Sequence, residues 1–340
     1  MDHREMNSVS CANCGKPATT KCSGCLAAPE YQPGDAPTTA YCDSQCQREQ
    51  WPTHKAQCRI LNKRRTLLRI AELLKTTLLA YRECVYDIPL TGVKYEEGIL
   101  RLLLDPRKIP YRPWQIPFPS DLNISPQHKE AVLATNQCTT AQCLLGPLAR
   151  YLLAGIKSTF KIAEVNAEPI VPWKIVWLND SKEESRSFDC AAVTHTILLV
   201  WIGGEGWVVD ITGCQFGFQE ILVPLNTYFK KRVRSISRGP FAYTEHETSD
   251  LDVFDCQLAL NDTDKKRLKA AHERAGRLHF AKFVKEHFDR YESTRPSEEL
   301  LSGTSEEFQG KLARFESNLK AHMTSFVDFA FGKERLNWSD

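Results

Sequence analysis

The chain lacks a long apolar run. The most strongly apolar stretch is about Ile197 to Ile202, far short of the roughly 20 residues that cross a bilayer as a helix. Met1 to Ser10 is polar and charged, which excludes a standard secretory signal. The formal net charge is only +2 over 340 residues, so no global field draws the chain to nucleic acid or to an acidic membrane. These absences predict an intracellular protein without a membrane partner and leave nucleus versus cytoplasm open.

Residues 1–60 also lack the aliphatic runs that would build an apolar core, yet they hold seven of the thirteen cysteines. Without a signal peptide, these cysteines are better interpreted as metal ligands and buried thiols than as disulfides. Their spacing gives four pairs: Cys11-x2-Cys14, Cys22-x2-Cys25, Cys42-x3-Cys46 and His54-x3-Cys58. The last two pairs have the i, i+4 spacing that places both ligands on one helix face. Eight ligands predict two tetrahedral zinc sites.

Zinc in such sites is structural. Protein side chains fill all eight positions, so no coordination position is left for water or substrate. Structural zinc contributes roughly 10–16 kcal/mol of apparent binding free energy in finger peptides, which is enough to fold a segment that has no apolar core. We therefore expect two structural Zn²⁺ ions as the cofactor.

The segment Tyr41-Cys42-x3-Cys46-Gln47-x3-Trp51-x2-His54-Lys55-x2-Cys58, together with the two upstream knuckles, resembles a MYND-type zinc finger over residues 11–58. The resemblance implies interleaved ligation. One zinc would bind Cys11, Cys14, Cys42 and Cys46, and the other Cys22, Cys25, His54 and Cys58. It also implies a peptide-binding finger for short proline-containing segments, with Ser44, Gln47 and Trp51 at the positions of the family's groove. The alternative for Trp51 is core packing beneath the helix.

One departure from the family is a longer spacer between Cys25 and Cys42, in which prolines, Gly34 and Asp35 indicate an irregular loop. Residues 1–60 carry six basic and six acidic residues, and the zinc–thiolate centres add negative charge. The loaded finger is then acidic, which favours a protein or peptide partner over nucleic acid.

The rest of the chain predicts an α+β fold. A helical and proline-rich connection over 62–120 begins with an amphipathic helix from Asn62 to about Tyr86, whose cations are expected on a solvated face rather than a nucleic-acid patch. An α+β domain follows over 121–340. It begins with helix from about Gln127 to Gly155, and strands are expected at 159–165, 173–178, 194–202 and 207–211. Two helices, to Tyr291 and from Ser305 to Phe331, complete the chain.

A second set of residues has the order of a thiol nucleophile, its base and its orienting acid. Cys138 lies at a helix start, His195 opens one strand and Asp210 lies on the next. The helix, the Ala154-Gly155-Ile156 segment and the Trp-x2-Asp-x-Thr strand resemble the transglutaminase-like branch of the papain-type fold over about 136–216. Ile197 replaces a common aromatic, no clear glycine turn precedes Cys138, and Cys143 competes as nucleophile.

These patterns support two functions. The first is a zinc-dependent interaction protein whose finger docks a partner. The alternative is a cysteine hydrolase or acyltransferase with a Cys138–His195–Asp210 triad that the finger recruits. An ordinary sheet is the competing interpretation of the triad, with His195 a satisfied core histidine, Asp210 capping a turn and Cys138 a buried thiol. Histone-lysine methylation finds no support, because the chain has no Asn-His-x-x-x-Pro-Asn-like segment.

Overall fold

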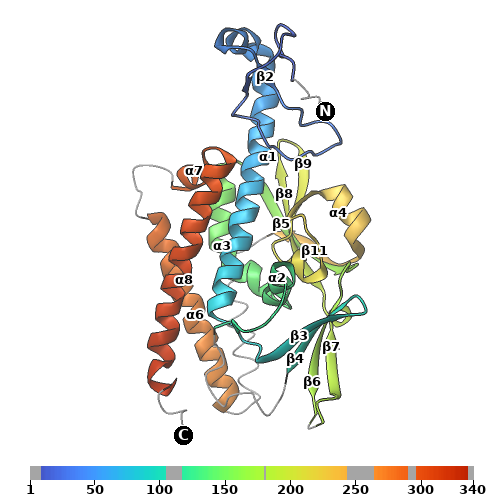
Figure 1. The fold of residues 1–340 in the computed structure, drawn as a ribbon, viewed down its shortest axis with the longest axis vertical. Helices are drawn as coiled ribbons and strands as arrows, with labels where there is room; N and C mark the ends of the chain where they lie inside the picture. Colours follow the sequence, from blue (N-terminus) through green and yellow to red (C-terminus); the bar gives the residue numbers. More distant parts are fainter. Residues whose placement is uncertain (1–8, 105–116, 180, 243–263, 290–295, 336–340) are drawn as a thin grey trace, which may run out of the picture.

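The computed structural model describes residues 9–104, 117–179, 181–242, 264–289 and 296–335. A small cysteine-rich finger stands at one end of an elongated molecule, and a long helix joins it to a larger domain of sheets and helices (Figure 1). The fold is α+β, as the sequence predicts. The proline-rich stretch from Pro106 lies mostly outside the described residues, as do the capping candidates at 261–263.

The helix that joins the two parts, α1, runs without a break from Ser44 to Cys84. The sequence pattern predicted its start near Asn62, so this prediction was wrong by about five turns. The Asp43 side chain caps the true start by accepting a hydrogen bond from the Cys46 amide at 2.8 Å. Pro52 lies inside the helix, where proline normally breaks the pattern. Predicted zinc ligands lie on both sides of it, at Cys46 and His54.

A five-stranded antiparallel sheet with the order β10-β9-β8-β5-β11 forms the centre of the larger domain. Its strands are β5 (Thr159–Ala167), β8 (His195–Ile202), β9 (Glu205–Val209), β10 (Leu222–Pro224) and β11 (Val233–Ala242). Side chains alternate between the two faces of a sheet, and strand β8 carries apolar residues on both faces. Leu198 and Val200 pack with the apolar faces of α1 and α3 (Cys138–Gly155). Ile197 and Leu199 pack with Tyr228 of α4 (Leu225–Arg232) on the other face.

A second sheet of four strands, β3-β4-β6-β7, lies at the end of the domain away from the finger (Figure 1). It contains β3 (Leu90–Glu96), β4 (Ile99–Leu104), β6 (Trp173–Leu178) and β7 (Glu184–Asp189). Strands β4 and β6 pair in parallel. The sequence predicted only β6 of this sheet. Helix α2 (Pro126–Ala134) packs beside it through Val132, which shares a core with Leu100 and Trp173.

The C-terminal helices complete the core. They are α6 (Asp264–Asp289), α7 (Pro296–Leu301) and α8 (Ser305–Arg335). Their aromatic residues Phe280, Phe308 and Phe315 are buried against α1 and α3. None of the helices in the described residues is long and apolar enough to cross a membrane.

Candidate functional site

The first group of metal ligands comprises Cys11, Cys14, Cys42 and Cys46, whose sulfur atoms all lie within 4.8 Å of one another. Tetrahedral zinc with Zn–S bonds of about 2.3 Å requires sulfur–sulfur edges of about 3.8 Å. The sulfur atoms of Cys14 and Cys42 are 3.6 Å apart, and those of Cys42 and Cys46 are 3.4 Å apart. The four thiols therefore have the spacing of one zinc-sized tetrahedron.

The second group comprises Cys22, Cys25, His54 and Cys58, and all four residues are buried. The sulfur atoms of Cys22 and Cys58 are 3.8 Å apart. His54 Nε2 lies 3.4 Å from the Cys22 sulfur and 3.6 Å from the Cys25 sulfur. With a Zn–N bond of about 2.05 Å, the expected nitrogen–sulfur edge is about 3.5 Å. This group fits a second zinc ion, and the alternation of the two groups along the chain is the interleaving that the resemblance implies.

Local structure presents these ligands without help from an apolar core. Strands β1 (Thr20–Lys21) and β2 (Ala40–Tyr41) pair antiparallel and bring the second knuckle beside the start of α1. Tyr41 is buried and meets the His54 ring edge-on at 6.3 Å. In the knuckle, Gly24 passes so close to the metal centre that a Cβ there would lie 2.8 Å from the Cys58 sulfur. Only glycine fits at this position.

The three groove residues from the resemblance lie on one face of α1, because their spacing of three and four residues matches the helical repeat. Ser44 is exposed and Gln47 is half-buried. Trp51 is 43% exposed, and its ring leans on His54 with centroids 6.1 Å apart. The tryptophan therefore does not pack beneath the helix. Part of its indole is open to solvent, and the rest lies against His54, which is one of the metal ligands.

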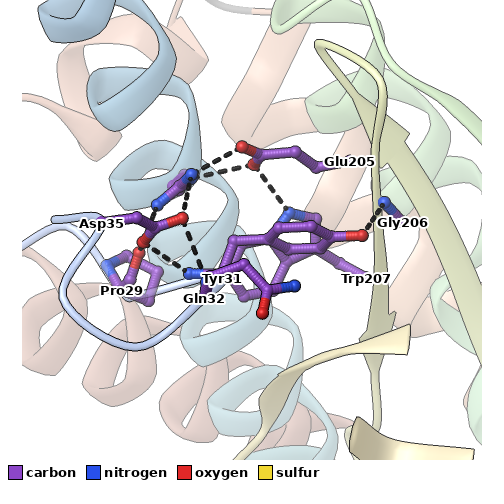
Figure 2. Close-up of polar contacts among 8 residues, drawn as sticks. Pro29, Tyr31, Gln32, Asp35, Glu205, Gly206 and Trp207 are labelled. Carbon is purple, nitrogen blue, oxygen red and sulfur yellow. Dashed lines mark hydrogen bonds and ion pairs between the residues drawn. The ribbon is translucent and has the colours of Figure 1, made fainter. Parts of the chain in front are cut away.

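The long spacer of the finger has a structural role that the sequence did not reveal. Arg64 of α1 is buried and forms ion pairs with Asp35 of the spacer at 2.7 Å and with Glu205 of β9 at 2.5 Å. The two carboxylates bind different edges of the guanidinium: Asp35 accepts from Nη1 and Nη2, and Glu205 accepts from Nε and Nη2 (Figure 2). We call these three residues the Arg64 cluster. Burial opposes the charge of Asp35, but Arg64 and two backbone amides hold the pKa of Asp35 below its ordinary value.

Aromatic contacts extend the Arg64 cluster. Tyr31 of the spacer packs on Trp207 of β9 with ring centroids 5.2 Å apart, and its hydroxyl accepts a hydrogen bond from the Gly206 amide at 3.4 Å. Figure 2 shows the spacer lying against the start of β9 through these contacts. The loop thus ties the finger to the sheet.

The structure brings Cys138, His195 and Asp210 together at one end of the five-stranded sheet. His195 Nε2 lies 2.9 Å from Asp210 Oδ1, and the hydroxyl of Tyr228 donates to Asp210 Oδ2 at 2.7 Å. All of these side chains are buried. The other ring nitrogen of His195, Nδ1, has no hydrogen-bond partner among the described residues. Tyr228 is a member of this cluster that the sequence analysis missed, and no motif around it indicated a role.

Cys138 is the first residue of α3 and is 5% exposed. Its thiol donates to the Thr194 carbonyl oxygen at 3.5 Å, one residue before His195. Asn136 has a φ of 56°, a left-handed conformation that asparagine adopts readily. It therefore makes the turn for which the sequence offered no glycine. Phe216 meets the His195 ring edge-on at 4.8 Å, so an aromatic contact exists although Ile197 is not aromatic. Cys143 is buried further along α3.

The protonation states follow from these contacts. Burial disfavours the Cys138 thiolate, yet the nearby His195 side chain favours the thiolate strongly enough to outweigh burial, so the pKa of Cys138 is lowered. Burial also disfavours the His195 imidazolium, but the charge and hydrogen bond of Asp210 raise the pKa of His195 to about 10. The pKa of Asp210 is lowered despite burial because His195 and Tyr228 stabilise the carboxylate. The contacts thus shift Cys138 toward the thiolate and His195 toward the imidazolium relative to their ordinary pKa values.

Comparison with known families agrees with the geometry of the finger. Residues 11–58 match the family model of the MYND finger. The chain therefore carries a MYND-type, zinc-binding finger with two structural metal sites, and such fingers are in general protein-interaction modules. No curated protein and no solved structure matches the chain.

Proposed function

We propose that this protein is a zinc-dependent interaction protein whose finger docks proline-containing peptide segments on Ser44, Gln47 and Trp51. Trp51 is the observation that carries the proposal. Its indole is 43% exposed, although the side chain stands on a helix that two zinc sites fix in place. Proline-rich segments bind exposed aromatic faces because their extended conformation is already formed before binding.

Substitution of the tryptophan tests this function. Binding of an array of proline-containing peptides to the zinc-loaded chain is measured by fluorescence anisotropy, and Trp51→Ala is expected to weaken the best binder at least tenfold. Tyr95→Ala is the matched control because Tyr95 is 50% exposed on β3 in the other half of the molecule. Equal affinities of the wild type and Trp51→Ala would remove Trp51 from the proposed groove.

The second candidate function is a cysteine hydrolase or acyltransferase of the transglutaminase-like type, and the approach of His195 to Asp210 favours it. A histidine held at Nε2 by a buried carboxylate keeps Nδ1 for proton exchange with a thiol. The thiolate of Cys138 would attack an acyl carbonyl carbon and form a thioester, while His195 gives its proton to the leaving amine. Water or a second amine would then release the acyl group. Cys138 is almost fully buried, so the site must open to admit a substrate.

Thioester formation tests this candidate. The zinc-loaded chain is incubated with a pool of activated acyl esters and amides, and intact mass and peptide mapping locate any acyl adduct. The adduct is expected on Cys138 and absent from Cys138→Ser. Cys143→Ser serves as the control because Cys143 is a second buried thiol on the same helix. An adduct that persists in Cys138→Ser and is lost in Cys143→Ser would assign the nucleophile to Cys143.

A further inference from the structure

The exposed face of α1 continues beyond the groove residues toward the larger domain. Seven residues on α1 are spaced by three or four positions and therefore share one face of the helix: Ser44, Gln47, Trp51, Lys55, Arg59, Asn62 and Thr66. At 1.5 Å per residue they follow one line about 33 Å long. Lys55, Arg59 and Asn62 are exposed. One open surface therefore leads from the finger to the larger domain.

The Arg64 cluster covers a different side of this helix. Arg64 follows Lys55 by nine residues, which corresponds to half a turn of rotation around the axis. The finger's long spacer lies on that side, against β9. The spacer therefore leaves the face that carries Trp51 and Lys55 open to solvent.

The surface ends in a basic pocket at the junction of α1, α3 and the α7–α8 turn. This cavity of about 550 Å³ is lined by Lys63 and Arg65 of α1, by Lys157 after α3, and by Leu301 to Gly303. None of the described residues that line it is acidic. Arg65 binds the Ser23 carbonyl oxygen in the second zinc knuckle and the Asn62 side chain, while its Nε is buried without a hydrogen-bond partner among the described residues.

The cations on this face and in the pocket have no carboxylate partner among the described residues. Among the described residues, no ion pair involves Lys55, Arg59, Lys63, Arg65 or Lys157. We call Lys55, Arg59 and Lys63, together with the pocket cations Arg65 and Lys157, the basic stripe. Most other buried or half-buried cations of α1 have partners: Lys75 pairs with Glu130 and Arg82 with Asp87.

We propose that the basic stripe binds an acidic tract of the same partner whose proline-containing segment lies on Trp51. The proposal rests on the proposed docking function and adds the chemistry of the partner. Trp51 and Lys63 are twelve residues apart, about 18 Å along the helix and about a third of a turn around it. An extended peptide covers this distance with five or six residues. The partner therefore carries a run of Asp or Glu of about that length directly beside its proline-containing segment.

Charge favours a peptide over nucleic acid on this surface. The zinc–thiolate centres make the finger acidic, and an acidic ligand is attracted only beyond Trp51, where the stripe begins. A nucleic-acid strand carries charge along its whole length and would meet the acidic finger on the same face. A peptide separates a neutral proline-containing part from an acidic part, which matches the division of charge along α1.

The test compares three fluorescein-labelled peptides on the full zinc-loaded chain. The first is the best proline-containing binder from the array. The second carries the same sequence with six glutamates added at both ends, and the third has six glutamines added at both ends. At low salt the glutamate form is expected to bind at least tenfold more tightly than the glutamine form. High salt should remove this advantage, because exposed charges are screened.

Two double variants locate the effect. Lys55→Gln/Arg59→Gln should abolish the glutamate advantage and leave the affinity of the parent peptide unchanged. Lys161→Gln/Lys230→Gln removes two exposed cations from β5 and α4 and should retain the advantage. Two outcomes overturn the stripe proposal and leave the groove proposal standing. In the first, the parent peptide binds but added glutamates do not tighten binding. In the second, the glutamate advantage survives in Lys55→Gln/Arg59→Gln.

The remaining outcomes separate the stripe from the groove. If the parent peptide fails to bind while a glutamate peptide binds through Lys55 and Arg59, the groove proposal fails and the stripe remains an acidic-tract site. If a duplex DNA competitor binds the stripe more tightly than the glutamate peptide, the surface belongs to nucleic acid and the proposal is wrong.

Discussion

Arg64 and Asp35 meet at 2.7 Å although they belong to different parts of the molecule. Asp35 lies in the spacer between the second and third ligand pairs of the finger, and Arg64 lies on α1 where that helix passes the sheet. The same guanidinium binds Glu205 at the start of β9. The contact explains why the finger has a long spacer, since the loop must reach from the metal sites to the sheet.

Removal of Arg64 should uncouple the finger from the sheet. Arg64→Ala leaves Asp35 and Glu205 facing each other without a cation, and their side chains are only 29% and 15% exposed. We expect a loss of about 3 kcal/mol in the free energy of unfolding, the lower end of the range for a broken buried ion pair. Arg64→Lys should recover little, because an ammonium group cannot reproduce the forked geometry. The measurement is urea denaturation of the zinc-loaded chain.

Arg234→Ala is the control for that measurement. Arg234 pairs with Glu168, and both side chains are more than half exposed. Its loss should lower the free energy of unfolding far less than the loss of Arg64, because water screens an exposed ion pair. Equal stability of Arg64→Ala and Arg234→Ala would show that the Arg64 cluster does not hold the finger.

Zinc removal should unfold the finger and spare the larger domain. Residues 11–58 owe their structure to eight metal ligands, whereas the sheets and the C-terminal helices have apolar cores of their own. Native mass spectrometry should detect two zinc ions per chain. After chelation, amide resonances of residues 11–58 should collapse to random-coil positions while those of β5 and β8 persist. Unchanged finger resonances in the metal-free chain would contradict the structural role of zinc.

Gly24→Ala should eject the second zinc ion selectively. The added methyl group would lie 2.8 Å from the Cys58 sulfur, inside the contact distance, so the ligand must move away from the metal. We expect one bound zinc ion per chain by mass spectrometry in place of two, with the Cys11 site retained. Gly155→Ala is the matched control, because a Cβ at Gly155 meets nothing within 4 Å. Two bound zinc ions per chain in Gly24→Ala would show that the knuckle can shift to accommodate the added methyl group.

The reactivity of Cys138 should depend on His195 and on pH in a defined direction. In the wild type, alkylation by iodoacetamide should rise with a midpoint below the ordinary thiol pKa of 9.0, because the pKa of Cys138 is lowered. In His195→Gln the imidazolium is lost while burial, which raises the pKa of Cys138, stays, so the midpoint should move to higher pH than in the wild type. Peptide mapping after timed quenching gives the rate at Cys138 itself. Identical midpoints in the two proteins would show that His195 does not activate the thiol.

The zinc finger was predictable from sequence because its ligand spacings are local. Two cysteines separated by two residues, or two ligands one helical turn apart, constrain geometry whatever the rest of the chain does. Cys138, His195 and Asp210 were also selected by their order along the chain, and the structure brings them together. Their catalytic role stays a prediction.

Other features depend on distant contacts and gave no local signal. Lys63-Arg64-Arg65 has the sequence of a basic run, yet the middle residue alone is buried and paired with carboxylates from the spacer and from β9. The early start of α1 was missed because its finger segment has no apolar periodicity, and the metal replaces packing there. Strands β3 and β4 were missed because they follow a helix directly and pair mainly with each other and with β6.

Because α1 is unbroken, it fixes the rotation and the distance of the finger relative to the sheet. Each residue added to a helix turns everything beyond it by about 100° and moves it by 1.5 Å. A single insertion between Cys58 and Arg64 would therefore rotate Trp51 around the helix axis and carry Asp35 away from the guanidinium. Seven added residues would nearly restore the orientation, but they would move the finger by about 10.5 Å along the axis, so the chain length between these residues is restricted to its present value.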